Sequence, residues 1–71
     1  MIRKTIQGID GYLSDSERYI SPLGEISLLT PCIATSNKYE IYCIKGNLFN
    51  DIERYNTLED AENRIYELLE P

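Results

Sequence analysis

The sequence predicts a small α+β domain, in which a meander-like antiparallel sheet of three to five strands is covered on one face by a C-terminal amphipathic helix. Residues 58–69 repeat apolar side chains at helical spacing, and residues 38–44 are rich in aromatic and β-branched residues. Turn-forming residues separate the other apolar segments. Leu, Ile and Phe supply 19 of the 71 residues, above the roughly 20% level below which disorder is expected. We therefore expect one folded domain over residues 1–71.

A single apolar stripe predicts the C-terminal helix over residues 58–69. The residues of the stripe recur at helical spacing and are Leu58, Ala61, Ile65, Leu68 and Leu69. Thr57, followed three residues later by Asp60, matches a capping signature in which the threonine side chain accepts from an N–H of the first turn. The spacing of Asp60 and Arg64 predicts an i,i+4 ion pair.

The segment before the helix predicts a β-hairpin. Residues 38–44 place apolar side chains on both faces, which is typical of an interior strand. Gly46-Asn47 predicts a two-residue type II′ turn, from which a strand returns to about Tyr55.

The two-residue turn fixes which residues of this hairpin face each other. It places Ile41 opposite Ile52, an apolar pair suited to the core. It also places Glu40 opposite Glu53, and this like-charge pair counts against the register.

The middle of the chain predicts a further strand with a disruption. Residues 25–34 are mostly apolar but contain Pro31, which cannot donate a ladder hydrogen bond. We therefore expect an edge strand or a strand with a bulge. Residues 22–24 and 35–38 carry the turn signals on either side.

The N-terminal third leaves two alternatives. Residues 2–9 alternate apolar and polar side chains and predict a strand, and Asp10-Gly11 predicts a hairpin turn after it. Residues 14–21 then fit either the return strand or a short helix near 15–20, which the Ser-x-x-Glu pattern starting at residue 14 would cap.

The net charge of the chain indicates which class of molecule it can bind. Seven basic and twelve acidic residues give a net charge of −5, with a single pair of adjacent basic residues. This composition opposes direct binding to nucleic acid or to an anionic membrane and favours a protein partner with a basic surface. The sequence has no apolar run that could span a bilayer and no signal-peptide pattern, so we expect a cytoplasmic protein with reduced cysteines.

The residues available for chemistry are few. The chain has no histidine, so Ser–His and Cys–His nucleophilic pairs are excluded, and Cys32 and Cys43 are too few for a tetrahedral zinc site. The cysteines fit buried, unreactive positions. Asp10, Asp15 and Glu17 lack the spacing of a calcium loop, and the four glycines form no phosphate-binding motif. We expect no enzyme activity, no catalytic residue, no cofactor and no bound metal.

The helix offers the one candidate site. Glu59, Asn63, Tyr66 and Glu70 form a stripe that faces away from the apolar one. An aromatic ring among acidic side chains can dock on a basic protein surface, although a solvated helix face has the same composition.

The predicted function is that of a small acidic, non-enzymatic interaction module that binds a partner protein. One alternative is an acidic mimic of nucleic acid that inhibits a DNA- or RNA-binding protein. A second alternative is a small-ligand-binding module or an accessory subunit of an enzyme. The small core also favours a homodimer through an exposed sheet edge or face.

Overall fold

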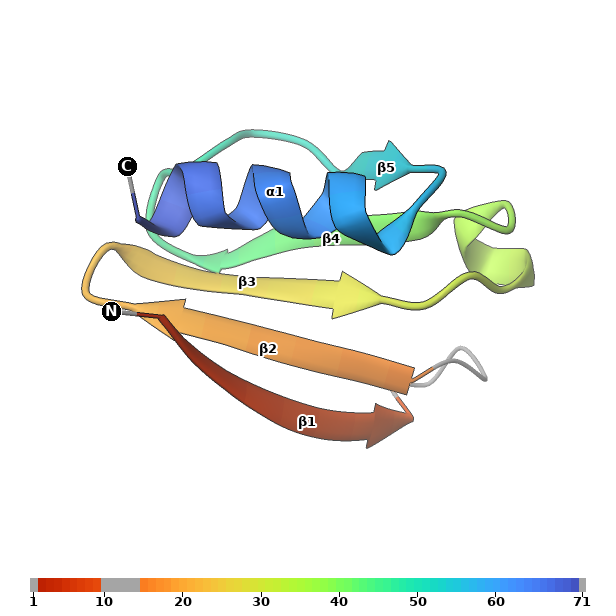
Figure 1. Ribbon diagram of the computed structural model, residues 1–71, viewed down its shortest axis with the longest axis horizontal. Helices are drawn as coiled ribbons and strands as arrows, with labels where there is room; N and C mark the ends of the chain where they lie inside the picture. The colour runs from red at the N-terminus through yellow and green to blue at the C-terminus, as the bar shows by residue number, and fades with distance from the viewer. Residues whose placement is uncertain (1, 10–14, 71) are drawn as a thin grey trace.

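The computed structural model describes residues 2–9 and 15–70 and has the predicted α+β architecture. One antiparallel sheet runs in the order β1-β2-β3-β4-β5, so each strand pairs with its sequence neighbours, and the helix α1 lies along one face (Figure 1). The elements are β1 (Arg3–Ile9), β2 (Asp15–Ser21), β3 (Gly24–Leu29), the 3-10 helix η1 (Ile33–Thr35), β4 (Tyr39–Lys45), β5 (Glu53–Tyr55) and α1 (Leu58–Leu69). The Asp10-Gly11 turn prediction lies outside the described residues.

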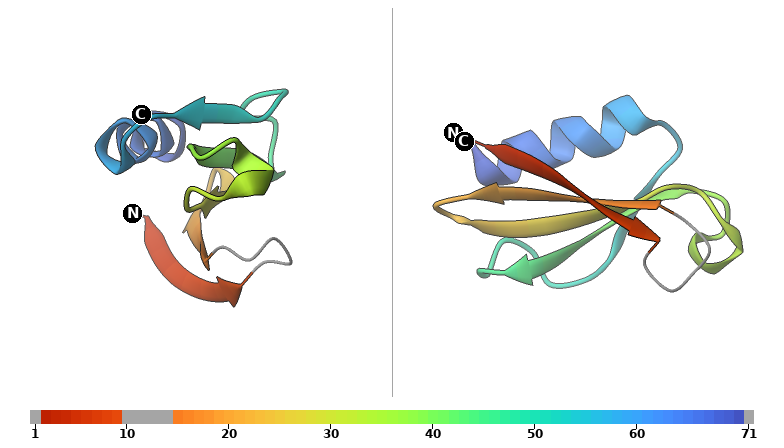
Figure 2. Two further views of the ribbon diagram at one scale, coloured as in Figure 1. Left: turned by 90° about the vertical axis from the view of Figure 1, so that its right-hand side faces the viewer. Right: turned by 90° about the horizontal axis from the view of Figure 1, so that it is seen from below.

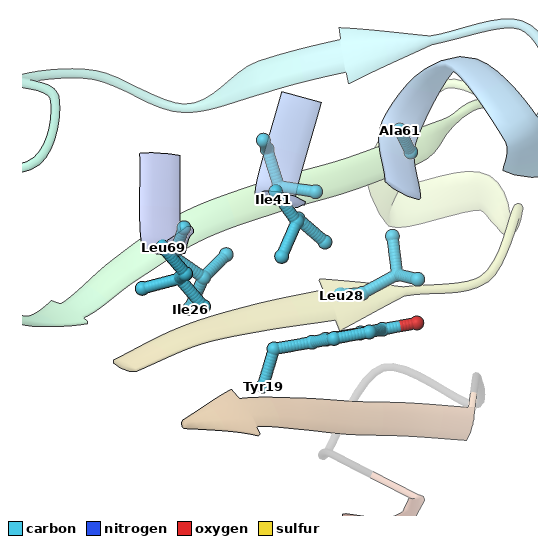
Figure 3. Close-up of a cluster of buried hydrophobic side chains, with 7 residues drawn as sticks. Tyr19, Ile26, Leu28, Ile41, Ala61 and Leu69 are labelled. Carbon is cyan, nitrogen blue, oxygen red and sulfur yellow. The ribbon is translucent and has the colours of Figure 1, made fainter. Parts of the chain in front are cut away.

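The helix lies on one face of the sheet (Figure 2), and the core side chains fill the space between them (Figure 3). Alternate residues of β2, β3 and β4 point toward the helix, because side chains alternate across a strand. The buried cluster consists of Tyr19, Ile26, Leu28, Ile41, Ala61, Ile65 and Leu69. Leu58 was predicted to belong to the apolar stripe, but it is 41% exposed. It lies in the first turn of α1, where the helix begins at the edge of the buried cluster.

The bounds of α1 confirm the predicted helix, including its N-terminal cap. The Thr57 side chain accepts a hydrogen bond of 3.1 Å from the Asp60 backbone N–H. The predicted Asp60–Arg64 ion pair is wrong. Arg64 instead lies 3.0 Å from Glu53 of β5 and 2.8 Å from Glu67. The carboxylate from the neighbouring strand, together with an acid one turn later, outcompetes an exposed i,i+4 partner.

The predicted hairpin register is wrong by one residue. In the structure, Glu40 lies opposite Arg54, and their side chains form an ion pair of 3.0 Å. This register removes the unfavourable Glu40–Glu53 pair. The two-residue turn is replaced by a loop over residues 46–52, and Ile52, which was expected on the core face, is 54% exposed.

The edge-strand prediction for the middle segment is also wrong. β3 is the central strand of the sheet and ends at Leu29, so Pro31 lies beyond its last ladder bond and imposes no edge position. A register shift does occur in β3, but between Glu25 and Ile26.

The alternative at residues 14–21 is resolved in favour of the strand. β2 covers residues 15–21, pairs on both sides, and places Tyr19 in the core. A two-residue turn at Pro22-Leu23 then joins β2 to β3, as the turn signal predicted.

Candidate functional site

All four residues of the predicted docking stripe are exposed, three of them on α1 and Glu70 at its C-terminal cap. Glu59, Asn63 and Glu70 are exposed, and Tyr66 is 44% exposed. They recur at spacings of three or four residues, so they follow one face of the helix. The structure therefore brings the predicted residues together on a single surface.

The Tyr66 ring is held in place by the core rather than standing free. It meets the ring of Tyr19 edge-on, with centroids 6.2 Å apart and planes at 87°. Tyr19 itself is fully buried. Edge-to-face aromatic pairs contribute about 0.5–1.5 kcal/mol beyond the area they bury. The exposed aromatic of the stripe is thus fixed in orientation before any partner arrives.

A network of charged side chains surrounds the hydroxyl end of Tyr19 and links β1, β2 and α1. The Tyr19 hydroxyl lies 3.0 Å from a carboxylate oxygen of Glu62 in α1 and 3.2 Å from one of Glu17 in β2. The ammonium of Lys4 in β1 lies 2.9 Å from Glu17 and 3.8 Å from Glu62, and 5.4 Å from the Tyr19 ring centroid. A phenol has one hydrogen for two carboxylates, so Lys4 compensates the second negative charge.

This network was not predicted from the sequence. The sequence contained one indication of it. If residues 15–21 form a strand, their alternation puts Glu17 and Tyr19 on the same face. Lys4 and Glu62 lie far apart along the chain, and no local pattern joins them.

The network shifts the pKa of two of its members. Burial, followed by the hydrogen bond to Glu62 and the charges of both carboxylates, raises the pKa of Tyr19 far above its ordinary value. The hydrogen bond to Glu17 raises the pKa of Lys4, although desolvation opposes that effect. Both groups therefore keep their protons to a higher pH in the folded chain than in the unfolded chain.

This shift predicts a loss of stability in alkali. Unfolded tyrosine has a pKa of about 10, so the contribution of Tyr19 is fully present below that pH and is lost as the pH rises above it. We expect Tyr19→Phe to lower the free energy of unfolding by about 1–2 kcal/mol at neutral pH. We expect the same variant to lose less stability than the parent as the pH is raised beyond 10.

Urea unfolding at neutral pH and in alkali would measure both effects. Tyr39→Phe, which removes the hydroxyl of a half-buried tyrosine on β4, is the matched control. Equal alkaline losses in the parent and in Tyr19→Phe would contradict the role given to the Tyr19 proton.

The charge of α1 is nearly all negative. Its one basic residue, Arg64, is held between Glu53 and Glu67, with hydrogen bonds of 3.0 and 2.8 Å. The hydrogen bond from Arg64 lowers the pKa of Glu53. The exposed acids of the helix surface are Glu59, Asp60, Glu67 and Glu70. Arg64 neutralises Glu67, so a basic partner would meet the others unpaired.

The remaining sequence candidates do not gather around this surface. Cys32 and Cys43 are not joined by a disulfide and are half-buried, although full burial was expected. The Cys43 thiol donates to the backbone carbonyls of Lys45 and Gly46, at 3.2 and 3.1 Å. Asp10 and the side chain of Asp15 lie outside the described part of the chain.

Three further observations concern residues 2–9 and 15–70. No three Cys, Asp or Glu side chains there converge in a way that could hold a metal ion. None of the helices in the same ranges has the length and apolar character needed to cross a bilayer. The inward stripe of α1 is apolar, with Ala61, Ile65 and Leu69 buried, while Glu62 beside it accepts a hydrogen bond from the buried Tyr19 hydroxyl.

Comparison with known proteins gives no relative: no protein-family model, curated protein or solved structure matches this chain. Function therefore has to be inferred from the geometry and charge of the α1 surface.

Proposed function

We propose that the chain is a non-enzymatic, cytoplasmic interaction module whose helix α1 docks on a basic surface of a partner protein. One observation carries the proposal. An exposed tyrosine, Tyr66, is fixed against the buried Tyr19 ring at 6.2 Å and lies in an acidic helix surface with Glu59 and Glu70. Fixed aromatic side chains are typical anchors of protein interfaces, because little rotamer entropy is lost when they bind.

The charges around Tyr66 favour a basic partner. Complementary charge increases the association rate and selects among partners more than it adds affinity. With Arg64 already bound by Glu53 and Glu67, the helix offers no free cation to attract an acidic surface. The same acids, repeated along one helix, also fit a nucleic-acid-binding protein as partner, in which case the helix would occupy the groove that normally holds phosphates.

A triple substitution tests the surface. The variant Glu59→Lys, Tyr66→Ala and Glu70→Lys should lose partner binding by more than tenfold, because it removes the anchor and reverses two charges. Its melting temperature should fall by only a few degrees, since the edge contact with Tyr19 is the main interaction removed. Asp51→Lys, on the exposed loop after β4, is a control for charge reversal alone.

The measurement is a pull-down with the tagged chain across a salt series, followed by titration of the partner that is identified. The proposal expects one partner that is released as salt rises, is not retained by the triple variant, and is retained by Asp51→Lys. Competition by a DNA or RNA duplex for that partner would identify the chain as a nucleic-acid mimic. Equal binding of the parent and the triple variant would make the helix surface an ordinary solvated face.

A further inference from the structure

The outer face of the sheet, opposite α1, carries a shallow hollow. On β4, Ile41 points into the core, so Glu40 and Tyr42 on either side of it point outward. The hollow has a volume of about 460 Å³, and its lining residues are Leu29, Ala34, Glu40, Tyr42, Ile52 and Arg54. Neither the helix nor a second sheet covers this face within the described residues (Figure 2).

Exposed isoleucines border the hollow. Ile52, on its lining, is 54% exposed, and Ile33, which directly precedes the lining residue Ala34 in η1, is 94% exposed. A single exposed apolar residue needs no explanation, but two large ones beside an apolar hollow indicate an interaction surface. Ile52 directly precedes β5, and the one-residue register difference there puts it on the same side as Arg54, which faces Glu40.

The hollow is electrically balanced, in contrast to the helix side of the molecule. Its two charged residues, Glu40 and Arg54, neutralise each other at 3.0 Å. The acids of α1 lie on the opposite face of the sheet, where they account for most of the chain's net charge of −5. Two copies that meet through this hollow would keep their acidic helices apart, and the two charged residues of its lining would be buried as a pair.

We propose that this outer face is the surface through which two copies of the chain form a dimer. A two-fold symmetric interface uses the same patch on both copies, so the patch must complement itself. Ile52 lies on the lining of the hollow and Ile33 is the neighbour of a lining residue, so the same region offers exposed apolar side chains on both copies. Burial of Ile33 and Ile52 would also add apolar contact that a 71-residue core lacks.

The size of the outer face of the sheet limits the affinity that we expect for the dimer. The molecule measures 31 × 21 × 20 Å, and a standard interface buries about 800 Å² on each partner, so the dimer must use nearly the whole outer face. We expect a dissociation constant on the order of micromolar. The dimer does not depend on the proposed docking of α1, which uses the opposite side of the molecule.

Sedimentation velocity over micromolar to millimolar concentrations of the purified chain tests the proposal. The parent should shift from monomer to dimer, and Ile33→Asp and Ile52→Asp should each weaken the dimer at least tenfold, because each places a charge in an apolar contact. Leu23→Asp is the matched control, since Leu23 is 50% exposed in the turn between β2 and β3, and it should leave the dimer unchanged. Circular dichroism melts verify that each variant is folded.

Two further measurements use the parent chain and do not depend on a variant with a weakened dimer. Amide shifts that change with concentration should map to the strands around the hollow and leave Asn63 on α1 unaffected. Salt should strengthen the dimer by screening the like charges of the copies, whereas it should weaken docking through the acidic helix.

A parent that stays monomeric at millimolar concentration would overturn the proposal. So would a dimer that survives both isoleucine substitutions, one that Leu23→Asp weakens equally, or concentration-dependent shifts confined to α1.

Discussion

Ile65→Ala is expected to lower the free energy of unfolding by about 2–5 kcal/mol, the range for truncating a buried isoleucine. Ile65 is fully buried in α1 and packs in the cluster that joins the helix to β2, β3 and β4. A domain of 71 residues has a total stability of roughly 4–11 kcal/mol. The substitution would therefore remove a large fraction of it and lower the melting temperature by at least about 10 °C.

Leu58→Ala is the control variant, because the sequence pattern and the structure give different expectations for its effect on stability. Both residues belong to the same predicted apolar stripe, but Leu58 is 41% exposed. Its truncation should cost less than about 1 kcal/mol. Urea and thermal unfolding of the two variants would measure the difference. Equal losses would mean that α1 packs along its whole stripe, contrary to the structure.

The helix could be predicted from the sequence because its determinants are local. The apolar repeat and the Thr57 cap act within a few residues of each other, and the observed α1 has the predicted bounds. The strand assignment at residues 38–44 was confirmed for a similar reason. The candidate stripe on α1 follows from the same helical period, so its exposure was predictable while its function was not.

The β4–β5 register could not be predicted from its turn signal. Gly46-Asn47 favours a tight hairpin locally, but Leu48 and Phe49 of the observed loop pack against the core. Burial of these side chains outweighs the preference of two residues for a tight turn. The ion pair between Glu40 and Arg54, at 3.0 Å, favours the same register.

Pro31 and the capping pattern at residue 14 were misleading for a different reason. Each is a local pattern that can indicate different structures, depending on where the nearby strand or helix begins or ends. β3 stops at Leu29, two residues before the proline, and burial of the β2 residue Tyr19 against α1 favours a strand over a capped helix. The network of Lys4, Tyr19 and Glu62 needs β1, β2 and α1 assembled before its members meet.

The second large effect is expected at Gly24, where the turn between β2 and β3 crosses the loop after β4. A Cβ atom added at Gly24 would lie 2.3 Å from the backbone carbonyl oxygen of Lys45 and 3.1 Å from the Leu48 side chain. Gly46, on the other side of this crossing, has a φ of +91° and its own close contact with the Leu23 carbonyl oxygen. The two glycines allow the backbones to approach more closely than any side chain permits.

Gly24→Ala should therefore lower the free energy of unfolding by about 3 kcal/mol, at the upper end of the range for overpacking. A flexible side chain could move aside at small cost, but the Lys45 carbonyl belongs to the backbone at the end of β4 and cannot move without disturbing the sheet. Leu23→Ala, in the same turn and on an exposed side chain, should cost less than about 1 kcal/mol. Denaturant unfolding of both variants measures the contrast. A Gly24→Ala variant as stable as the parent would mean that the turn does not pack against Lys45.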